Sequence, residues 1–102
     1  MELPQLVTFC QVAEQERFTK AAETLFLTQA AVSQQIEALE QELGVRLFER
    51  GARGIAVTDA GRELHRHATD LIRRCQAMTE AVGQAAQGLT DEVKVAASTV
   101  YY

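Results

Sequence analysis

The segment TKAAETLFLTQAAVSQQIEALEQELG, residues 19–44, decides the fold of this chain. Its first part carries small residues at helical spacing, which predicts a short helix with Thr19 as N-cap and with room for close packing of another helix. The FLTQ stretch has no helical pattern, and Thr28 can cap a second helix. A short helix, a turn of about four residues and a second helix form a helix-turn-helix.

The second predicted helix has an apolar side and a polar side. Val32, Ile36, Leu39 and Leu43 form a stripe at helical spacing that is expected to be buried, and Gly44 ends the helix. The outward positions are Ala30, Ala31, Gln34, Glu37, Ala38 and Gln41, with Ser33 on the flank.

The outward side chains suit the major groove of DNA, where the first residues of such a helix reach base edges. Gln34 can bond adenine N6 and N7, and Ala30 can contact a thymine methyl. Ser33 and Gln29 can reach bases or phosphates. Two short packed helices also occur in many small domains, where a polar face is only solvated, so the spacing alone leaves both interpretations open.

The residues on either side of this motif predict a further helix and a hairpin. Residues 4–15 have helical spacing, with Pro4 in the first turn. After Gly44, VRLFER and IAV are typical of two strands joined by the glycine turn GARG, residues 51–54. We expect Val45, Leu47 and Phe48 to face the core.

Charge is unevenly distributed along the chain. The 102 residues carry ten Lys and Arg and fourteen Asp and Glu, for a net charge of −4, yet residues 44–74 hold seven arginines against four acidic residues. Arg46, Arg50 and Arg53 cluster around the hairpin turn, where they either contact phosphate and the minor groove or are simply solvated. The overall charge therefore does not exclude DNA binding, although it predicts a weak dependence of affinity on salt.

A long helix is predicted to begin at Thr58 and Asp59 and to end near Gln87, a length of about 43 Å at 1.5 Å per residue. Its apolar residues follow an unbroken heptad pattern: Leu64, Ala68, Leu71, Cys75, Met78, Val82, Ala85 and Leu89. This stripe either packs on the chain's own small core or pairs with another copy. A helix that is longer than its domain favours the second interpretation.

Several classes of protein are not indicated. No apolar run approaches the ~18–20 residues of a membrane span, and the N-terminus lacks the features of a signal peptide. We therefore expect an unexported, cytoplasmic protein with no membrane contact and with reduced, buried Cys10 and Cys75. His65 and His67 lie two apart on a predicted helix, cannot share a metal, and are expected to be solvated or near DNA. Without a nucleophile elbow or a phosphate loop, no enzyme activity, metal or cofactor is expected in this chain.

Three stretches in register resemble the N-terminal domain of LysR-type transcriptional regulators: MELxQLxxF at the start, FTKAAETLFLTQAAVSQQIEALEQELGVRLFER from residue 18, and GIAVTDAG from residue 54. The resemblance covers about residues 1–90. It implies a mainly α fold, namely a winged helix-turn-helix with a three-helix core and a two-stranded β-hairpin wing, followed by a long dimerisation linker helix. The expected parts are a DNA-binding domain over 1–58, a linker helix over 59–88, and the hinge and first strand of a truncated effector-binding domain over 89–102.

The resemblance implies a sequence-specific regulator that binds an inverted-repeat operator in double-stranded DNA as a homodimer. It also implies a small-molecule effector, bound by a C-terminal domain absent from this chain, and a tetramer as a possible full-length state. The family's DNA contacts fall on Thr28, Gln29, Ala30, Ser33, Gln34, Arg50 and Arg53. Its dimer contacts fall on Leu64, Ala68, Leu71, Cys75, Met78 and Val82.

This sequence departs from the family pattern at two places around the second helix of the motif, which is called the recognition helix. Thr28-Gln29-Ala30 replaces the usual Ser-Gln-Pro, and Gln34 replaces a residue that is commonly basic. These changes put the base preferences in doubt and shift phosphate binding toward the wing. The alternative function is a protein-interaction module that recruits a different partner through the heptad helix.

Overall fold

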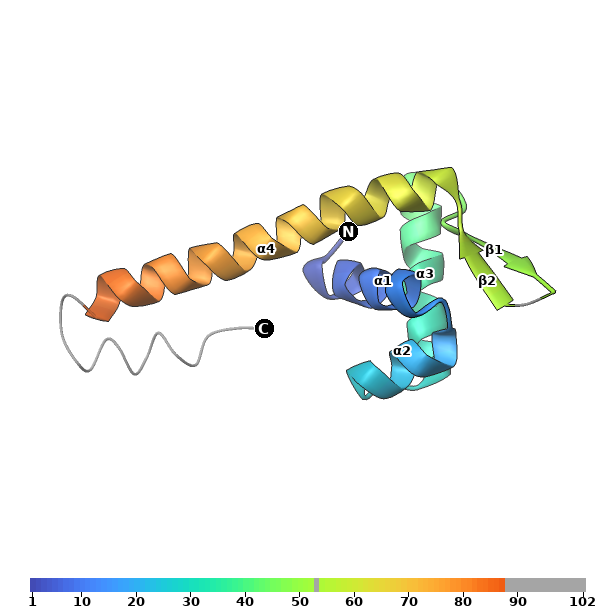
Figure 1. Ribbon diagram of the computed structural model, residues 1–102, viewed down its shortest axis with the longest axis horizontal. Coiled ribbons are helices and arrows are strands. Elements are labelled where there is room, and N and C mark those ends of the chain that lie inside the picture. Colours follow the sequence, from blue (N-terminus) through green and yellow to red (C-terminus); the bar gives the residue numbers. More distant parts are fainter. Residues whose placement is uncertain (53, 88–102) are drawn as a thin grey trace. The chain divides into compact units, whose positions relative to one another are not determined.

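The computed structural model describes residues 1–52 and 54–87, which form four helices and one hairpin (Figure 1). In chain order the elements are α1 (Leu3–Gln15), α2 (Phe18–Leu25), α3 (Gln29–Leu43), β1 (Phe48–Gly51), β2 (Gly54–Val57) and α4 (Asp59–Gln87). The chain divides into two units, Met1–Thr69 and Asp70–Tyr102. The elements follow the predicted order, and each predicted helix and strand within the described residues is present.

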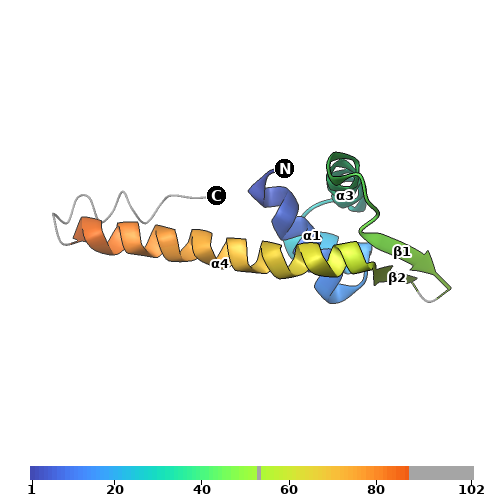
Figure 2. The same cartoon turned by 90° about the horizontal axis from the view of Figure 1, so that it is seen from above.

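The core of the first unit lies where α1, α2 and α3 meet, and Figure 2 shows these helices from a second side. Its largest fully buried side chains are Phe9, Val12, Val32, Leu39 and Leu47. The α2 helix contributes the buried small residues Ala21 and Ala22, which allow the close packing that the sequence predicts. Each large apolar side chain buried in this way contributes about 1.5–3 kcal/mol relative to exposure.

The ends of α3 form as predicted. The hydroxyl oxygen of Thr28 accepts a hydrogen bond from the Ala31 backbone N–H at 3.0 Å and so caps the helix. At the other end Gly44 adopts a φ of +70° and donates its N–H to the Glu40 carbonyl at 2.8 Å. A left-handed residue at this place favours glycine, and it turns the chain out of the helix.

The predicted start of α2 is wrong. This helix begins at Phe18, after an extended Arg17, so Thr19 lies inside the first turn and is not the N-cap. The Phe18 ring packs edge-on against Phe48, with ring centroids 6.0 Å apart. That contact with a distant strand draws Phe18 into the helix.

The first residues after α3 also differ from the prediction. Leu43 is 38% exposed and Val45 is 41% exposed, although both were expected in the core. The turn at Gly44 carries them outward, and β1 begins only at Phe48. Leu47 and Phe48 are buried as predicted.

A single carboxylate fixes the chain between α3 and the hairpin. The Oε2 atom of Glu40 accepts the Leu47 backbone N–H at 2.8 Å. The Leu47 residue is fully buried, so this bond satisfies a backbone donor that water cannot reach. Beyond it, β1 and β2 pair antiparallel, with Phe48 opposite Val57 and Gly51 opposite Gly54.

The start of α4 packs against the same segment. The Thr58 N–H donates to the Leu47 carbonyl at 3.0 Å, and the Thr58 hydroxyl donates to the Arg46 carbonyl at 2.7 Å. That hydroxyl also accepts the Gly61 N–H at 3.0 Å and caps α4. A Cβ at Gly61 would lie 2.6 Å from Cγ1 of Val57 and closer still to the Leu47 carbonyl oxygen. Only glycine allows so close an approach.

In the first unit, α4 contacts α1. Ala68 is buried, and Nε2 of His65 lies 3.1 Å from Oε2 of Glu14. The His65 ring centroid is 6.5 Å from that of Phe9. The expectation that His65 is solvated is therefore wrong, because this half-buried ring packs on the chain's own core. Its expected nearness to DNA stays a prediction.

The two cysteines have different surroundings. Both are free thiols, and Cys10 is buried as predicted. Burial raises the pKa of the Cys10 thiol above its usual value, because desolvation disfavours the thiolate. Cys75 is only half-buried, contrary to the prediction.

In the second unit, the described part of α4 carries exposed apolar side chains. Leu71 is 47%, Met78 is 62% and Val82 is 61% exposed. The predicted strand and hinge over 89–102 lie outside the described residues, as do Leu89 and Arg53. No helix in the described ranges is long and apolar enough to cross a membrane.

Replacement of Gly61 by alanine should lower the free energy of unfolding by about 1–3 kcal/mol, because the new methyl group must displace backbone at Leu47. Urea denaturation followed by circular dichroism measures the change. The matched control is Gly51→Ala, because a Cβ there meets only the Gly54 carbonyl at 3.9 Å. Equal stability of G61A and G51A would contradict the crowding argument.

Replacement of Glu40 by alanine should cost about 1–3 kcal/mol of stability, because the buried Leu47 N–H loses its acceptor. Glu40→Gln keeps an acceptor oxygen at that position and should recover most of the loss in the same denaturation experiment. If E40A and E40Q were equally stable, the hydrogen bond to Leu47 would not be the source of the effect.

Candidate nucleic-acid interface

The first half of α3 presents a polar surface to solvent. Thr28, Gln29, Ala30 and Gln34 are exposed, and Ser33 is half-buried on the flank of the helix. This agrees with the outward positions that the sequence predicts. The first turn of α3 contains no acidic residue, so the positive end of its helix dipole is available to an anion.

A small cleft of about 100 Å³ joins α3 to the hairpin. The buried side chains of Ile36 and Phe48 are among the residues that line it. Ser33 and Arg50 both line it, so two predicted site residues from different elements meet there. Arg46 and Arg50 are exposed, and Arg50 makes no ion pair with any residue that the structure describes. The guanidinium of Arg50 is therefore free to bind a phosphate.

A second basic position flanks the hairpin at the start of α2. Arg17 and Lys20 are exposed and line a pocket of about 490 Å³ together with Ile55 of β2. Neither residue is predicted from the sequence to contact DNA. The sequence shows only that two basic residues lie around the start of the first helix of the motif. Their nearness to β2 depends on tertiary structure and could not be predicted from it.

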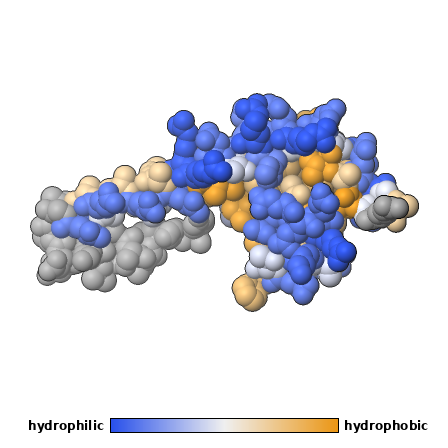
Figure 3. Space-filling model, in the orientation of Figure 1, coloured by the Kyte–Doolittle hydropathy of each residue, from blue (hydrophilic) through white to orange (hydrophobic). Residues whose placement is uncertain are grey.

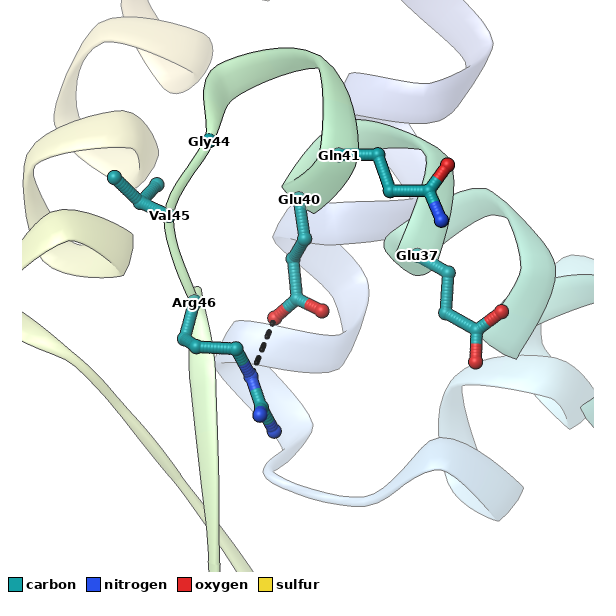
Figure 4. Close-up of a pocket in the computed structure, with 6 residues that line it drawn as sticks. All are labelled: Glu37, Glu40, Gln41, Gly44, Val45 and Arg46. Atoms are coloured by element: carbon teal, nitrogen blue, oxygen red, sulfur yellow. Dashed lines mark ion pairs between the residues drawn. The ribbon is translucent and has the colours of Figure 1, made fainter.

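Acidic side chains surround the second half of α3, and several of them are engaged. Figure 4 shows a pocket of about 580 Å³ lined by residues of this half and of the segment that follows it. Within it, the Glu40 carboxylate lies 3.8 Å from Nε of Arg46. Glu42 forms an ion pair with the N-terminal amine of Met1 at 2.7 Å. These contacts neutralise acid close to the proposed interface.

The arginines at the start of α4 are less available than the sequence suggests. Arg62 pairs with Asp59, and Arg66 pairs with Glu63. The hydrogen bond from Arg66 and its positive charge lower the pKa of the Glu63 carboxyl below its usual value. The positive excess predicted for residues 44–74 is thus partly cancelled along α4, whereas Arg50 has no ion-pair partner among the described residues.

The structure also bears on metal binding and on the predicted dimer residues. Across residues 1–52 and 54–87, no group of three or more His, Cys, Asp or Glu side chains could hold a metal ion. Of the predicted dimer residues, Ala68 is buried in the first unit, Leu64 and Cys75 are half-buried, and Leu71, Met78 and Val82 are exposed. Figure 3 shows apolar surface on α4 as well as on the first unit.

Comparison with known proteins gives consistent matches. Residues 3–62 match the family model of bacterial regulatory helix-turn-helix proteins, lysR family. The HTH-type transcriptional regulator YxjO of Bacillus subtilis (strain 168) is 43% identical over 96 residues, which are 94% of this chain and 33% of the relative. The chain spans about a third of the length of the first curated relatives it matches.

Two solved structures share the fold. The crystal structure of the BenM_DBD/catB site 1 DNA complex has a TM-score of 0.82 at 38% identity, covering 84% of this chain and 97% of that chain. The CbnR_DBD–DNA complex has a TM-score of 0.80 at 36% identity, covering 84% and 99%. The predicted winged helix-turn-helix with a long helix is thereby confirmed. The chain belongs to the lysR family of bacterial regulatory helix-turn-helix proteins.

Proposed function

We propose that this chain is the part of a LysR-type transcriptional regulator that recognises a specific sequence in double-stranded DNA, in the bacterial cytoplasm. One observation carries the proposal: the exposed polar half of α3 lies beside a hairpin whose Arg50 is unpaired among the described residues. Two DNA-bound domains of the same fold support it.

The recognition helix supplies the base contacts in this proposal. The Gln34 amide accepts a hydrogen bond from adenine N6 and donates one to N7, and Ala30 contacts a thymine methyl. Gln29 and Ser33 reach bases or phosphates at the edge of the groove. Thr28 caps the helix and, as an exposed residue at its start, contacts phosphate.

The wing supplies most of the phosphate contacts. Arg50 and Arg53 bind the backbone or enter the minor groove, and Arg17 and Lys20 extend the basic surface to the start of α2. Gln34 is neutral, so these four side chains provide the cationic contacts that the recognition helix lacks.

The exposed residues of α4 support a homodimer. Leu71, Met78 and Val82 leave apolar area in water at heptad spacing, and Cys75 continues the same series. Leu64 extends the stripe, whereas Ala68 already packs in the first unit. A two-fold dimer presents two recognition helices and therefore requires an inverted repeat in the DNA.

The whole regulator has further proposed parts. The first curated relatives are about three times as long as this chain, which supports an additional domain. We assign to that domain the binding of a small-molecule effector and the contacts of a tetramer. The relatives are named as transcriptional regulators, and we assign no catalytic role to the chain.

Selection of a random duplex library on the purified 102-residue chain tests the proposal. The expected result, at physiological salt, is enrichment of an interrupted palindrome. On the enriched duplex, Gln34→Ala should cost about 1–3 kcal/mol and relax the preference at one base pair. Retention of no DNA would contradict DNA binding and favour a protein-interaction module that uses the exposed stripe of α4.

Replacement of Leu71 by aspartate should convert the dimer into monomers, because an unpaired charge cannot be buried at an apolar interface. Sedimentation equilibrium measures the mass of each variant. Gln76→Asp, at an exposed position outside the stripe, is the matched control and should remain dimeric. A dimer that survives L71D would place the interface elsewhere.

A further inference from the structure

Glu37 lies on the exposed face of α3 that is proposed to contact DNA bases. It is exposed on α3, three residues after Gln34 and four after Ser33, and therefore shares their outward face. It lines the cleft that contains Ser33 and Arg50. It also lines the adjoining pocket, where Figure 4 shows its side chain pointing away from the Arg46–Glu40 pair.

The carboxylate of Glu37 has no partner within the described part of the chain. It makes no ion pair and no side-chain hydrogen bond there. By contrast, Glu40 accepts a hydrogen bond from Leu47 and pairs with Arg46, and Glu42 pairs with the N-terminal amine. All acceptor sites of Glu37 are therefore free. An unpaired carboxylate facing a duplex repels phosphate and lowers the affinity for every sequence. A base that offers a hydrogen-bond donor would compensate for this repulsion.

The chemistry of the major groove selects that base. Guanine presents two acceptors and thymine presents one, so either base opposes a carboxylate. Adenine presents a donor beside the acceptor N7, which repels the second carboxylate oxygen. Cytosine presents the N4 amino group as a donor and carries no major-groove acceptor of its own, because its other neighbour on that edge is C5–H and only O6 of the paired guanine lies beside N4. Cytosine is therefore the base that a free glutamate accepts best.

Resting on the proposed function, we propose that Glu37 is a specificity-determining residue that accepts a hydrogen bond from N4 of a cytosine in each half-site. Three residues advance a helix by about 4.5 Å, and base pairs stack about 3.4 Å apart. The cytosine therefore lies one or two base pairs from the position that Gln34 reads. Glu37 therefore discriminates between sequences and does not raise the affinity for DNA in general. The contact with cytosine offsets the repulsion between the carboxylate and the phosphates, and sequences without that cytosine retain the repulsion.

Parallel selections from one random duplex library test the proposal, using the 102-residue chain, its Glu37→Gln variant and its Glu42→Gln variant. The wild type should enrich a C·G pair at one fixed position of each half-site. E37Q should lose that preference and keep the rest of the motif. E42Q removes the same charge from the same helix and should keep the cytosine.

A modified base then tests the hydrogen bond itself. N4-methylcytosine keeps its Watson–Crick pair but replaces the major-groove N–H with a methyl group. At the selected position it should weaken wild-type binding about tenfold, the equivalent of one hydrogen bond to a charged group, and should leave E37Q unchanged. The same modification at a cytosine outside the half-sites is the control.

Two results would overturn the role of Glu37. If E37Q enriched the same motif and bound every duplex more tightly by a common factor, Glu37 would act only through repulsion. If N4-methylcytosine left wild-type affinity unchanged, no hydrogen bond would reach that base. A wild-type selection without any enrichment is a different failure, because it would overturn sequence-specific binding as a whole and Glu37's role with it.

Discussion

The backbone of Leu47 is the point on which the architecture of the first unit depends. Its N–H is bound by the Glu40 carboxylate of α3, and its carbonyl accepts the N–H of Thr58 just before α4. Its side chain is fully buried, and its carbonyl lies directly against Gly61. One residue thus joins the recognition helix, the hairpin and the first turn of α4. Because both bonds end on the buried backbone of Leu47, they keep the hairpin at a fixed place beside α3.

Charge is arranged so that an acidic chain can present a basic surface locally. The chain carries a net charge of −4. Glu40, Glu42 and Glu63 are each engaged with a nearby cation, which lowers their effect on a polyanion. Arg50, by contrast, has no acidic partner among the described residues and lines the cleft beside α3. The sign of the overall charge therefore says little about the field at the recognition helix.

The sequence predicts those features that depend on neighbours in the chain. The Thr28 cap, the glycine that ends α3 and the buried positions Val32, Ile36 and Leu39 all follow from local spacing, and all are present. The errors come from contacts between distant segments. Phe18 joins α2 because of Phe48, thirty residues away in the chain. His65 is held by Glu14, at a separation of 51 residues.

The same distinction applies to the candidate interface. The outward position of Gln34 follows from the helical period, and the structure places it there. The meeting of Ser33 and Arg50 in one cleft requires the hairpin to fold back beside α3. The nearness of Arg17 and Lys20 to β2 requires α2 to be placed as well, and no spacing in the sequence encodes it. The structural role of Glu40 was missed for the same reason, because its partner Leu47 lies beyond the helix.

The outward face of α3 carries none of the bonds that hold the fold together. Gln34 and Glu37 are exposed and make no side-chain hydrogen bond within the described ranges, while Thr28, Val32 and Glu40 on the same helix cap it, fill the core and anchor the hairpin. Mutations at the outward positions are therefore nearly neutral for folding. After a gene duplication, two copies of such a domain can drift apart in their DNA targets through viable intermediates, because each altered protein still reaches the native state.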